Sequence, residues 1–260
     1  MHSIKRRKQL FLWVIMMVAS SLIFSQIRVE NNSILKVKKT TDFIVTGNGS
    51  NDRWKQTDWN LITARSSKVL RKENWNIPAS AGSDENHSYK TQFKILYSEK
   101  GIYCLYVSED SIITSTIKED YLNLYDEDVV EAFFWTDTKL PVYFEYELSP
   151  LNYELPLLII NNKGTIMGWR PWQYTGDRKI MHAVSISEKD PTNNRISWMA
   201  EFFIPFALLS PMGNTPPEKG TRWRANFYRI DYDRKPVYSS WQLTRKNYHD
   251  PERFGTLEFD

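Results

Sequence analysis

Short segments of alternating hydrophobic and polar residues dominate the chain from Thr41 onward. This alternation predicts strands, because successive side chains on a strand point to opposite faces. No segment has the period of a long amphipathic helix, and Phe206–Leu209, which follows Pro205, predicts a single helical turn. The predicted strands are Thr91–Tyr97, Ile102–Val107, Val129–Trp135, Val142–Leu148, Leu155–Asn161, Ile180–Ser187, Ile196–Ile204, Arg222–Tyr232, Tyr238–Leu243 and Gly255–Phe259.

The spacing of these strands indicates the fold class. A turn at Glu99–Gly101 joins two of them into a hairpin, and Thr136–Pro141 joins a second pair. Leu155–Asn161 is continuously apolar after Pro150, which predicts a strand buried on both faces. Many short strands at this spacing are typical of a β-sandwich. The sequence therefore predicts one all-β domain over residues 42–260, a jelly-roll β-sandwich.

The N-terminal residues read as a targeting segment. A basic stretch, Lys5–Lys8, precedes the apolar stretch Leu10–Phe24, which at 15 residues is shorter than the roughly 20 that a membrane span needs. We predict a signal peptide over residues 1–25, with Ser25 at the cleavage point, and a linker over residues 26–41. An uncleaved N-terminal anchor is the alternative.

The same reading places the protein in a compartment. A signal peptide implies export to the periplasm, the cell surface or the medium. The single cysteine, Cys104, cannot form an internal disulfide, which fits a bacterial protein better than an animal secretory one. Cys104 lies in an apolar strand pattern and is expected to be a small buried residue.

Charge and composition limit the classes of partner that the protein is expected to bind. The net charge is +3, but without the leader, which has four basic residues and no acid, it falls to −1. A nearly neutral body gives no electrostatic basis for binding nucleic acid, and only an uncleaved leader would bind a membrane. Aromatic residues make up 14% of the chain, which favours a site built from flat rings.

Two predicted strands bring carboxylates and rings together. If the pair Val129–Trp135 and Val142–Leu148 is in register, one face collects both kinds of side chain. Carboxylates accept hydrogen bonds from sugar hydroxyls, and rings stack on the C–H face of a pyranose. The alternative is an ordinary solvated outer face. The side chains expected on this face are Glu131, Phe133, Trp135, Tyr143, Glu145 and Glu147.

The same acids allow a catalytic hypothesis. Hydrolysis of a glycosidic bond needs two carboxyl groups roughly 5–10 Å apart, and Glu131 with Glu145 or Glu147 could provide them. Any acidic β-protein supplies such pairs, so the sequence favours catalysis less than binding. The histidines have no metal-ligand spacing, and neither a phosphate loop nor a nucleophile elbow is present.

Two further groups are candidates. Trp169–Tyr174 holds three rings in a loop-like segment stiffened by Pro171, which predicts either a binding surface or a plug over one end of the sandwich. Acids cluster at Asp120, Asp126–Asp128 and Asp231–Asp233, where loop oxygens could hold Ca²⁺ or cap turns.

The order of several short motifs resembles a known family. The motifs are Gly47 to Trp54, the Phe93–Val107 hairpin, Asp128 to Glu131, Trp198–Pro205, Asn226–Asp231, Trp241 and His249–Gly255. With these motifs in this order, the chain from about residue 42 to the C-terminus is similar to carbohydrate-binding module family 9. This resemblance implies a jelly-roll sandwich that binds poly- or oligosaccharide, structural calcium, and association with glycoside hydrolases.

The resemblance also implies site residues. In sugar-binding members two tryptophans enclose a sugar ring, and the matching positions here are Tyr125 and Tyr248. Glu131 matches a carboxylate that accepts a hydroxyl, whereas Glu145 stands where an arginine is expected. Glu201 and Asn226 match motif positions that are expected to hold strands together.

The sequence therefore predicts an exported, non-catalytic carbohydrate-binding protein that supports polysaccharide breakdown. Tyr125 and Tyr248 are expected to stack on the sugar, and Glu131 and Glu145 to accept its hydroxyl hydrogen bonds. We add Trp169 and Trp172 as further stacking residues, without a motif match. The alternatives are a glycoside hydrolase, or a sandwich repurposed for surface protein contacts.

Overall fold

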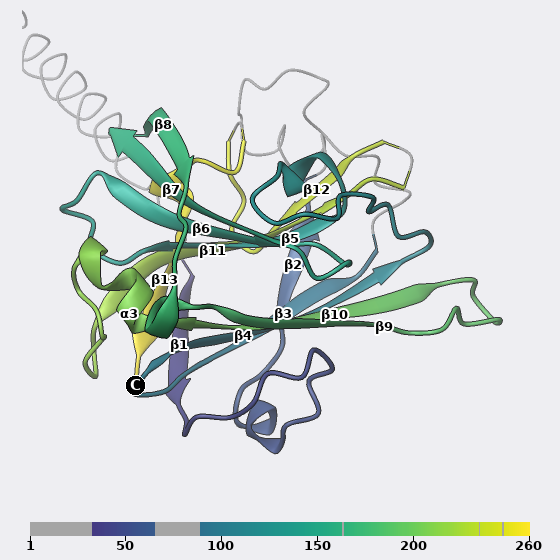
Figure 1. Ribbon diagram of the computed structural model, residues 1–260, viewed down its shortest axis with the longest axis horizontal. Helices are drawn as coiled ribbons and strands as arrows, with labels where there is room; N and C mark the ends of the chain where they lie inside the picture. The colour runs from purple at the N-terminus through teal and green to yellow at the C-terminus, as the bar shows by residue number, and fades with distance from the viewer. Residues whose placement is uncertain (1–32, 66–88, 163, 234, 246) are drawn as a thin grey trace, which may run out of the picture. The chain divides into compact units, whose positions relative to one another are not determined.

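Two β-sheets pack face to face, as Figure 1 shows for the computed structural model. One sheet has the order β8-β7-β6-β5-β11, with β12 and β13 both paired to β11, and we name it the site sheet. The other sheet, β2-β3-β4-β10-β9, we name the support sheet. The structure describes residues 33–65, 89–162, 164–233, 235–245 and 247–260.

Within the described ranges, thirteen strands make up the two sheets, and one turn of helix, α3 (Phe206–Leu209), follows β10. The strands are β1 (Ile34–Lys39), β2 (Asn60–Ala64), β3 (Thr91–Tyr97), β4 (Gly101–Asp110), β5 (Val129–Trp135), β6 (Val142–Leu148), β7 (Glu154–Asn162), β8 (Thr165–Pro171), β9 (Met181–Ile186), β10 (Ile196–Pro205), β11 (Arg222–Asp231), β12 (Val237–Ser240) and β13 (Gly255–Phe259).

The two sheets are joined along their edges. Strand β1 pairs in parallel with β13 and with β3, and β2 pairs with β12 and with β3. Both strands therefore run between the layers, as seen in Figure 1. Sharing strands in this way leaves fewer open edges on which another chain could pair.

The core lies between the facing surfaces of the sheets. Alternate residues point inward, so that Phe134, Tyr146 and Phe227 from the site sheet pack with Phe93 and Phe202 from the support sheet. The Cys104 thiol is buried in this core, as expected for a small hydrophobic residue. The prediction of an all-β sandwich is confirmed.

Most of the predicted strands are present with similar bounds, but three strands were missed. Ile34–Lys39 was assigned to the linker and is instead strand β1, in which only Val37 is fully buried in the core and Leu35 is partly buried against it, so that its apolar pattern is weak. β2 was not predicted, and β8 occupies part of the expected loop at Trp169–Tyr174. Strand β7 is buried on both faces only in its first half, because Ile160 is 51% exposed.

The predicted signal peptide and the first residues of the linker lie outside the described residues. In the ranges that the structure describes, no helix is both long enough and apolar enough to cross a membrane.

The outer faces of the two sheets are covered differently. On the support sheet, Phe43 and Trp54 from the N-terminal segment pack over Tyr103 and Phe203. On the site sheet, side chains of β5, β6 and β7 form a second apolar cluster with residues of the C-terminal loops, including Tyr248. This second face also carries a cavity.

Candidate functional site

The pairing of β5 with β6 brings the predicted residues onto one face. Glu131 lies opposite Glu147, and Phe133 lies opposite Glu145, in an antiparallel register. The face is the outer one of the site sheet, so the prediction of a shared patch of carboxylates and rings is confirmed. It is not a solvated face, because Glu131, Glu145 and Glu147 are all buried.

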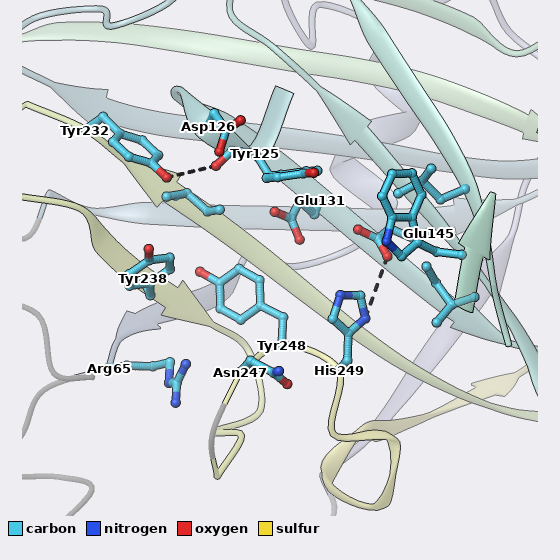
Figure 2. A pocket seen from close by; sticks show the side chains of 14 residues that line it. Arg65, Tyr125, Asp126, Glu131, Glu145, Tyr232, Tyr238, Asn247, Tyr248 and His249 are labelled. Atoms are coloured by element: carbon cyan, nitrogen blue, oxygen red, sulfur yellow. Dashed lines mark hydrogen bonds and ion pairs between the residues drawn. The ribbon is translucent and has the colours of Figure 1, made fainter. Parts of the chain in front are cut away.

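A cavity of about 530 Å³ opens on this patch. Its volume lies within the range of small-molecule sites. Glu131 and Glu145 line it, together with five aromatic residues, and Figure 2 shows both carboxylates pointing toward the space near Tyr248 and His249. The aromatic lining residues are Tyr125, Trp169, Tyr232, Tyr238 and Tyr248.

Tyr125 is placed by a short 3-10 helix, Leu124–Asp126, just before β5. Leu124 is buried beneath the helix, and the Tyr125 carbonyl accepts a 2.9 Å hydrogen bond from the Tyr232 hydroxyl. The Tyr125 ring remains half-buried at the cavity wall. These contacts fix the backbone and leave the phenol ring available to a ligand.

Tyr248 is held much more firmly than an open stacking surface would be. Its ring stacks on Tyr228, with centroids 4.0 Å apart. Its hydroxyl donates a 2.7 Å hydrogen bond to the Arg229 carbonyl and accepts one of 2.9 Å from the Ser239 amide. Tyr248 lines the cavity but is only 7% exposed, so a ligand meets a small part of its ring.

The two candidate tryptophans lie in different environments. Trp169 lies on β8 opposite Ile159, lines the cavity and is 52% exposed. Trp172 lies beyond the end of β8 and packs against the core, edge-on to Phe144 at 5.8 Å. Trp172 is therefore not among the residues that line the cavity, whereas Trp169 is.

The carboxyl groups of the patch are poorly compensated. Burial raises the pKa of Glu131 well above its ordinary value, and the charge of Glu145 raises it further. Burial raises the pKa of Glu145 to about 8, and a side-chain hydrogen bond with Glu147 lowers it by less than burial raises it. The pKa of Glu147 is raised by burial and by the charges of the other two. Glu145 Oε2 is buried without a hydrogen-bond partner among the described residues.

His249 forms the wall beside Glu145. Its Nδ1 shares a 2.7 Å hydrogen bond with the Tyr143 hydroxyl and lies 3.8 Å from Glu145 Oε2. Burial lowers the pKa of His249 to about 4, so the ring is neutral at pH 7. It provides no charge to balance Glu145.

The loop that carries His249 is closed by an ion pair. The Asp250 carboxylate accepts hydrogen bonds from the Arg245 amide and side chain, the shortest of them 2.5 Å. Pro251 then begins a 3-10 turn, Pro251–Arg253. A second cavity of about 520 Å³ lies along this loop and shares Asn247 and His249 with the first.

The acid clusters proposed for calcium are dispersed, apart from one group. Asp120 accepts the Glu154 amide in a 2.9 Å hydrogen bond, and Asp126 lines the cavity. Among the described residues, only Asp110, Asp128 and Asp231 bring three acidic ligand atoms within 4.8 Å of one another.

A guanidinium already provides the cation in this group. Arg229 Nη2 lies 2.7 Å from Asp110 and 3.3 Å from Asp231. Both oxygens of Asp128 accept backbone amides at 2.7 Å. These residues are arranged around Arg229 and do not fit Ca²⁺ unless it is displaced.

A sequence profile described as carbohydrate-binding family 9 matches residues 68–259. The chain belongs to carbohydrate-binding family 9. No curated protein matches it.

Solved structures share the fold of this family 9 chain. A proposed carbohydrate-binding protein from Bacteroides uniformis aligns with a TM-score of 0.66 at 16% identity, over 88% of this chain and 99% of its own. A family 9 module from Caldicellulosiruptor kristjanssonii in complex with cellotriose gives 0.57 at 14% identity, over 88% and 94%. The same description in complex with glucose gives 0.55 at 14%, over 88% and 96%.

Several lining residues of the family 9 chain were not predicted as site residues. Arg65, Tyr232, Asn247 and His249 line the cavity from segments that flank strands, and Tyr238 lines it from β12. Only His249 carried a signal, since it belongs to the closing motif of the resemblance. The other four have no local pattern that would distinguish them from ordinary strand or loop residues.

Proposed function

We propose that this family 9 chain is a non-catalytic carbohydrate-binding protein whose ligand occupies the cavity over β5 and β6. The observation that carries the proposal is the convergence of aromatic rings with Glu131 and Glu145, whose Oε2 has no partner among the described residues. Aromatic faces suit the C–H face of a pyranose, and carboxyl oxygens suit its hydroxyls.

The ligand is a poly- or oligosaccharide. The second cavity shares Asn247 and His249 with the first, and an oligosaccharide that passes over these two residues would reach both cavities. Glucose and cellotriose, which related structures contain, are the first probes. The basic and apolar leader supports export, and we propose a supporting role in polysaccharide breakdown.

A hydrolase is the second candidate, because Glu131 and Glu145 line one cavity and the pKa of Glu145 is raised to about 8, as suits a general acid. However, the pKa of Glu131 is also raised, so neither carboxyl is favoured as the ionised partner that hydrolysis needs. A sandwich used only for protein contacts would not need a cavity lined by both Tyr125 and Tyr248.

The test is a glycan-binding screen with the purified full-length protein, in which released sugar is measured in the same wells. The proposal predicts saturable binding without release. Release of product that is lost in Glu131→Gln would establish the hydrolase instead. Absence of both binding and release would reject a carbohydrate function.

A further inference from the structure

The site has an excess of acidic groups over cations. Three carboxyl groups lie side by side on β5 and β6, and among the described residues no lysine or arginine forms an ion pair with any of them. The nearest basic side chain, His249, is 3.8 Å from Glu145 and is kept neutral by burial. The three groups are Glu131, Glu145 and Glu147.

Arg65 also lines the cavity but is directed elsewhere. Its electrostatic neighbours include Asp250 and three tyrosines, and Arg65 is not among the groups that shift the pKa of Glu131 or Glu145. Figure 2 places Arg65 beyond Tyr248, away from Glu145. Its charge therefore serves the opposite end of the cavity.

One acceptor is left open toward the ligand. Glu145 is only 4% exposed and lines the cavity, and its Oε2 has no hydrogen-bond partner among the described residues. An unpaired buried acceptor destabilises the folded protein, and the cost is larger for a charged group. A donor on the ligand removes this cost, and a cationic donor removes the electrostatic cost as well.

The remaining walls also favour positive charge. The rings of Tyr125, Trp169, Tyr232, Tyr238 and Tyr248 line the same cavity as Glu131 and Glu145. Aromatic faces attract cations, most strongly where water is excluded. Rings that stack on a sugar thus also stabilise an ammonium group attached to it.

We propose that the cavity prefers a pyranose bearing a protonated primary amine, with the ammonium directed at Glu131 and Glu145. The preference is over the same ring with a hydroxyl or an acetamido group in place of the amine. It deepens the proposed carbohydrate-binding function and depends on it. An acetamido group would lack the charge and add bulk.

The test is isothermal titration of the full-length protein at pH 6 with glucosamine, glucose, N-acetylglucosamine and ethanolamine. We expect glucosamine to bind about tenfold more tightly than glucose, a difference of about 1.4 kcal/mol. Ammonium binding ionises a carboxyl group that is protonated in the free site. Repeating the titration in buffers of different ionisation enthalpy should therefore show proton release with glucosamine and none with glucose.

Variants assign the preference to the named groups. Glu145→Gln and, separately, Glu131→Gln should each reduce the preference to within about threefold and diminish the proton release. Glu188→Gln is the control: it removes an exposed acid that is distant in the sequence from Glu131 and Glu145, and it should keep both the preference for glucosamine and the proton release. Two independent sites of substitution guard against a variant that fails to fold.

Four results would overturn the proposal. Glucose that binds as tightly as glucosamine would reject it while the carbohydrate function stands. Ethanolamine that binds as tightly as glucosamine would show that a cation, and not an amino sugar, is recognised. Retention of the preference in both glutamine variants would place the ammonium elsewhere. If no sugar binds at all, the proposed function fails as well.

Discussion

Each sheet of the sandwich has a buried glutamate on its outer face, and the surroundings of the two differ. On the support sheet, Glu201 accepts hydrogen bonds from the Trp54 indole at 2.8 Å and from the amides of Thr46 and Gly47 at 3.0 and 2.8 Å. On the site sheet, Glu145 Oε2 has no such donor among the described residues.

The difference separates an anchor from a binding group. The donors of Glu201 come from the segment that covers the support sheet, so this carboxylate fastens that segment to the sandwich. The segments around Glu145 leave a cavity above it instead. A buried carboxylate without donors is a cost to the folded state, and it is retained here where a ligand can supply the donors.

The largest expected effect on stability comes from replacing Glu201, which fastens the N-terminal segment to the support sheet. Glu201→Gln places an amide NH₂ against groups that are themselves donors, which leaves buried N–H groups unpaired. We expect the free energy of unfolding to fall by about 2–4 kcal/mol. Urea denaturation at pH 7 measures it, and a fall below about 0.5 kcal/mol, within the range of ordinary surface substitutions, would contradict the role of Glu201.

A glutamate-to-glutamine substitution at Glu145 should instead increase the free energy of unfolding. An acid whose folded pKa is raised keeps its proton in the folded state, so its contribution to stability falls as pH rises from about 4.5 to about 8. Glu145→Gln cannot ionise and should gain about 1–3 kcal/mol over the wild type at pH 8, with little difference at pH 4.

Urea denaturation across this pH range tests the sign. The neighbouring groups Glu131 and Glu147 remain in the variant, so part of the pH dependence should persist. A variant that is destabilised at pH 8 would mean that ionised Glu145 has donors in the folded protein.

Much of the fold was predictable, because alternation reports burial wherever one face meets the core. β3, β5, β6 and β13 were predicted with their observed bounds, and so was the shared face of Glu131 and Glu145. β1 was not, since it buries one apolar side chain and owes its place to parallel pairing with β13 and β3.

The site was less predictable than the fold. Trp169 and Trp172 were both predicted to lie in a loop. Trp169 instead lies on strand β8, which pairs with β7 and has a register shift between Ile160 and Asn161, and Trp172 follows the end of that strand. Pairing with distant strands, which sequence does not reveal, decides which tryptophan meets the cavity. The charge of His249 likewise depends on burial that only the assembled loops create.

A smaller effect compares these two tryptophans. Trp169→Ala should weaken sugar binding about tenfold with little change in stability, because the ring is 52% exposed. Trp172→Ala should keep the affinity within about twofold and lower the free energy of unfolding by about 2 kcal/mol. Titration and urea denaturation of both variants measure this, and equal losses of affinity would contradict the assignment.

The smallest effect concerns calcium. Since the Arg229 guanidinium already pairs with Asp110 and Asp231, added Ca²⁺ or a chelator should shift the Tm by less than about 2 °C. Ca²⁺ at 100 times the Kd of a specific site would stabilise the fold by about 2.7 kcal/mol. The Tm would then rise by more than about 2 °C. Such a rise, measured by calorimetry, would show that calcium has a site after all.

The most direct test of the binding site is a crystal structure of the protein with the tightest ligand from the glycan screen. We predict a sugar ring in the cavity, in contact with Tyr125 and Trp169, with ligand donors within hydrogen-bond distance of Glu131 and Glu145. A sugar bound elsewhere on the sandwich, with this cavity free of ligand, would contradict it.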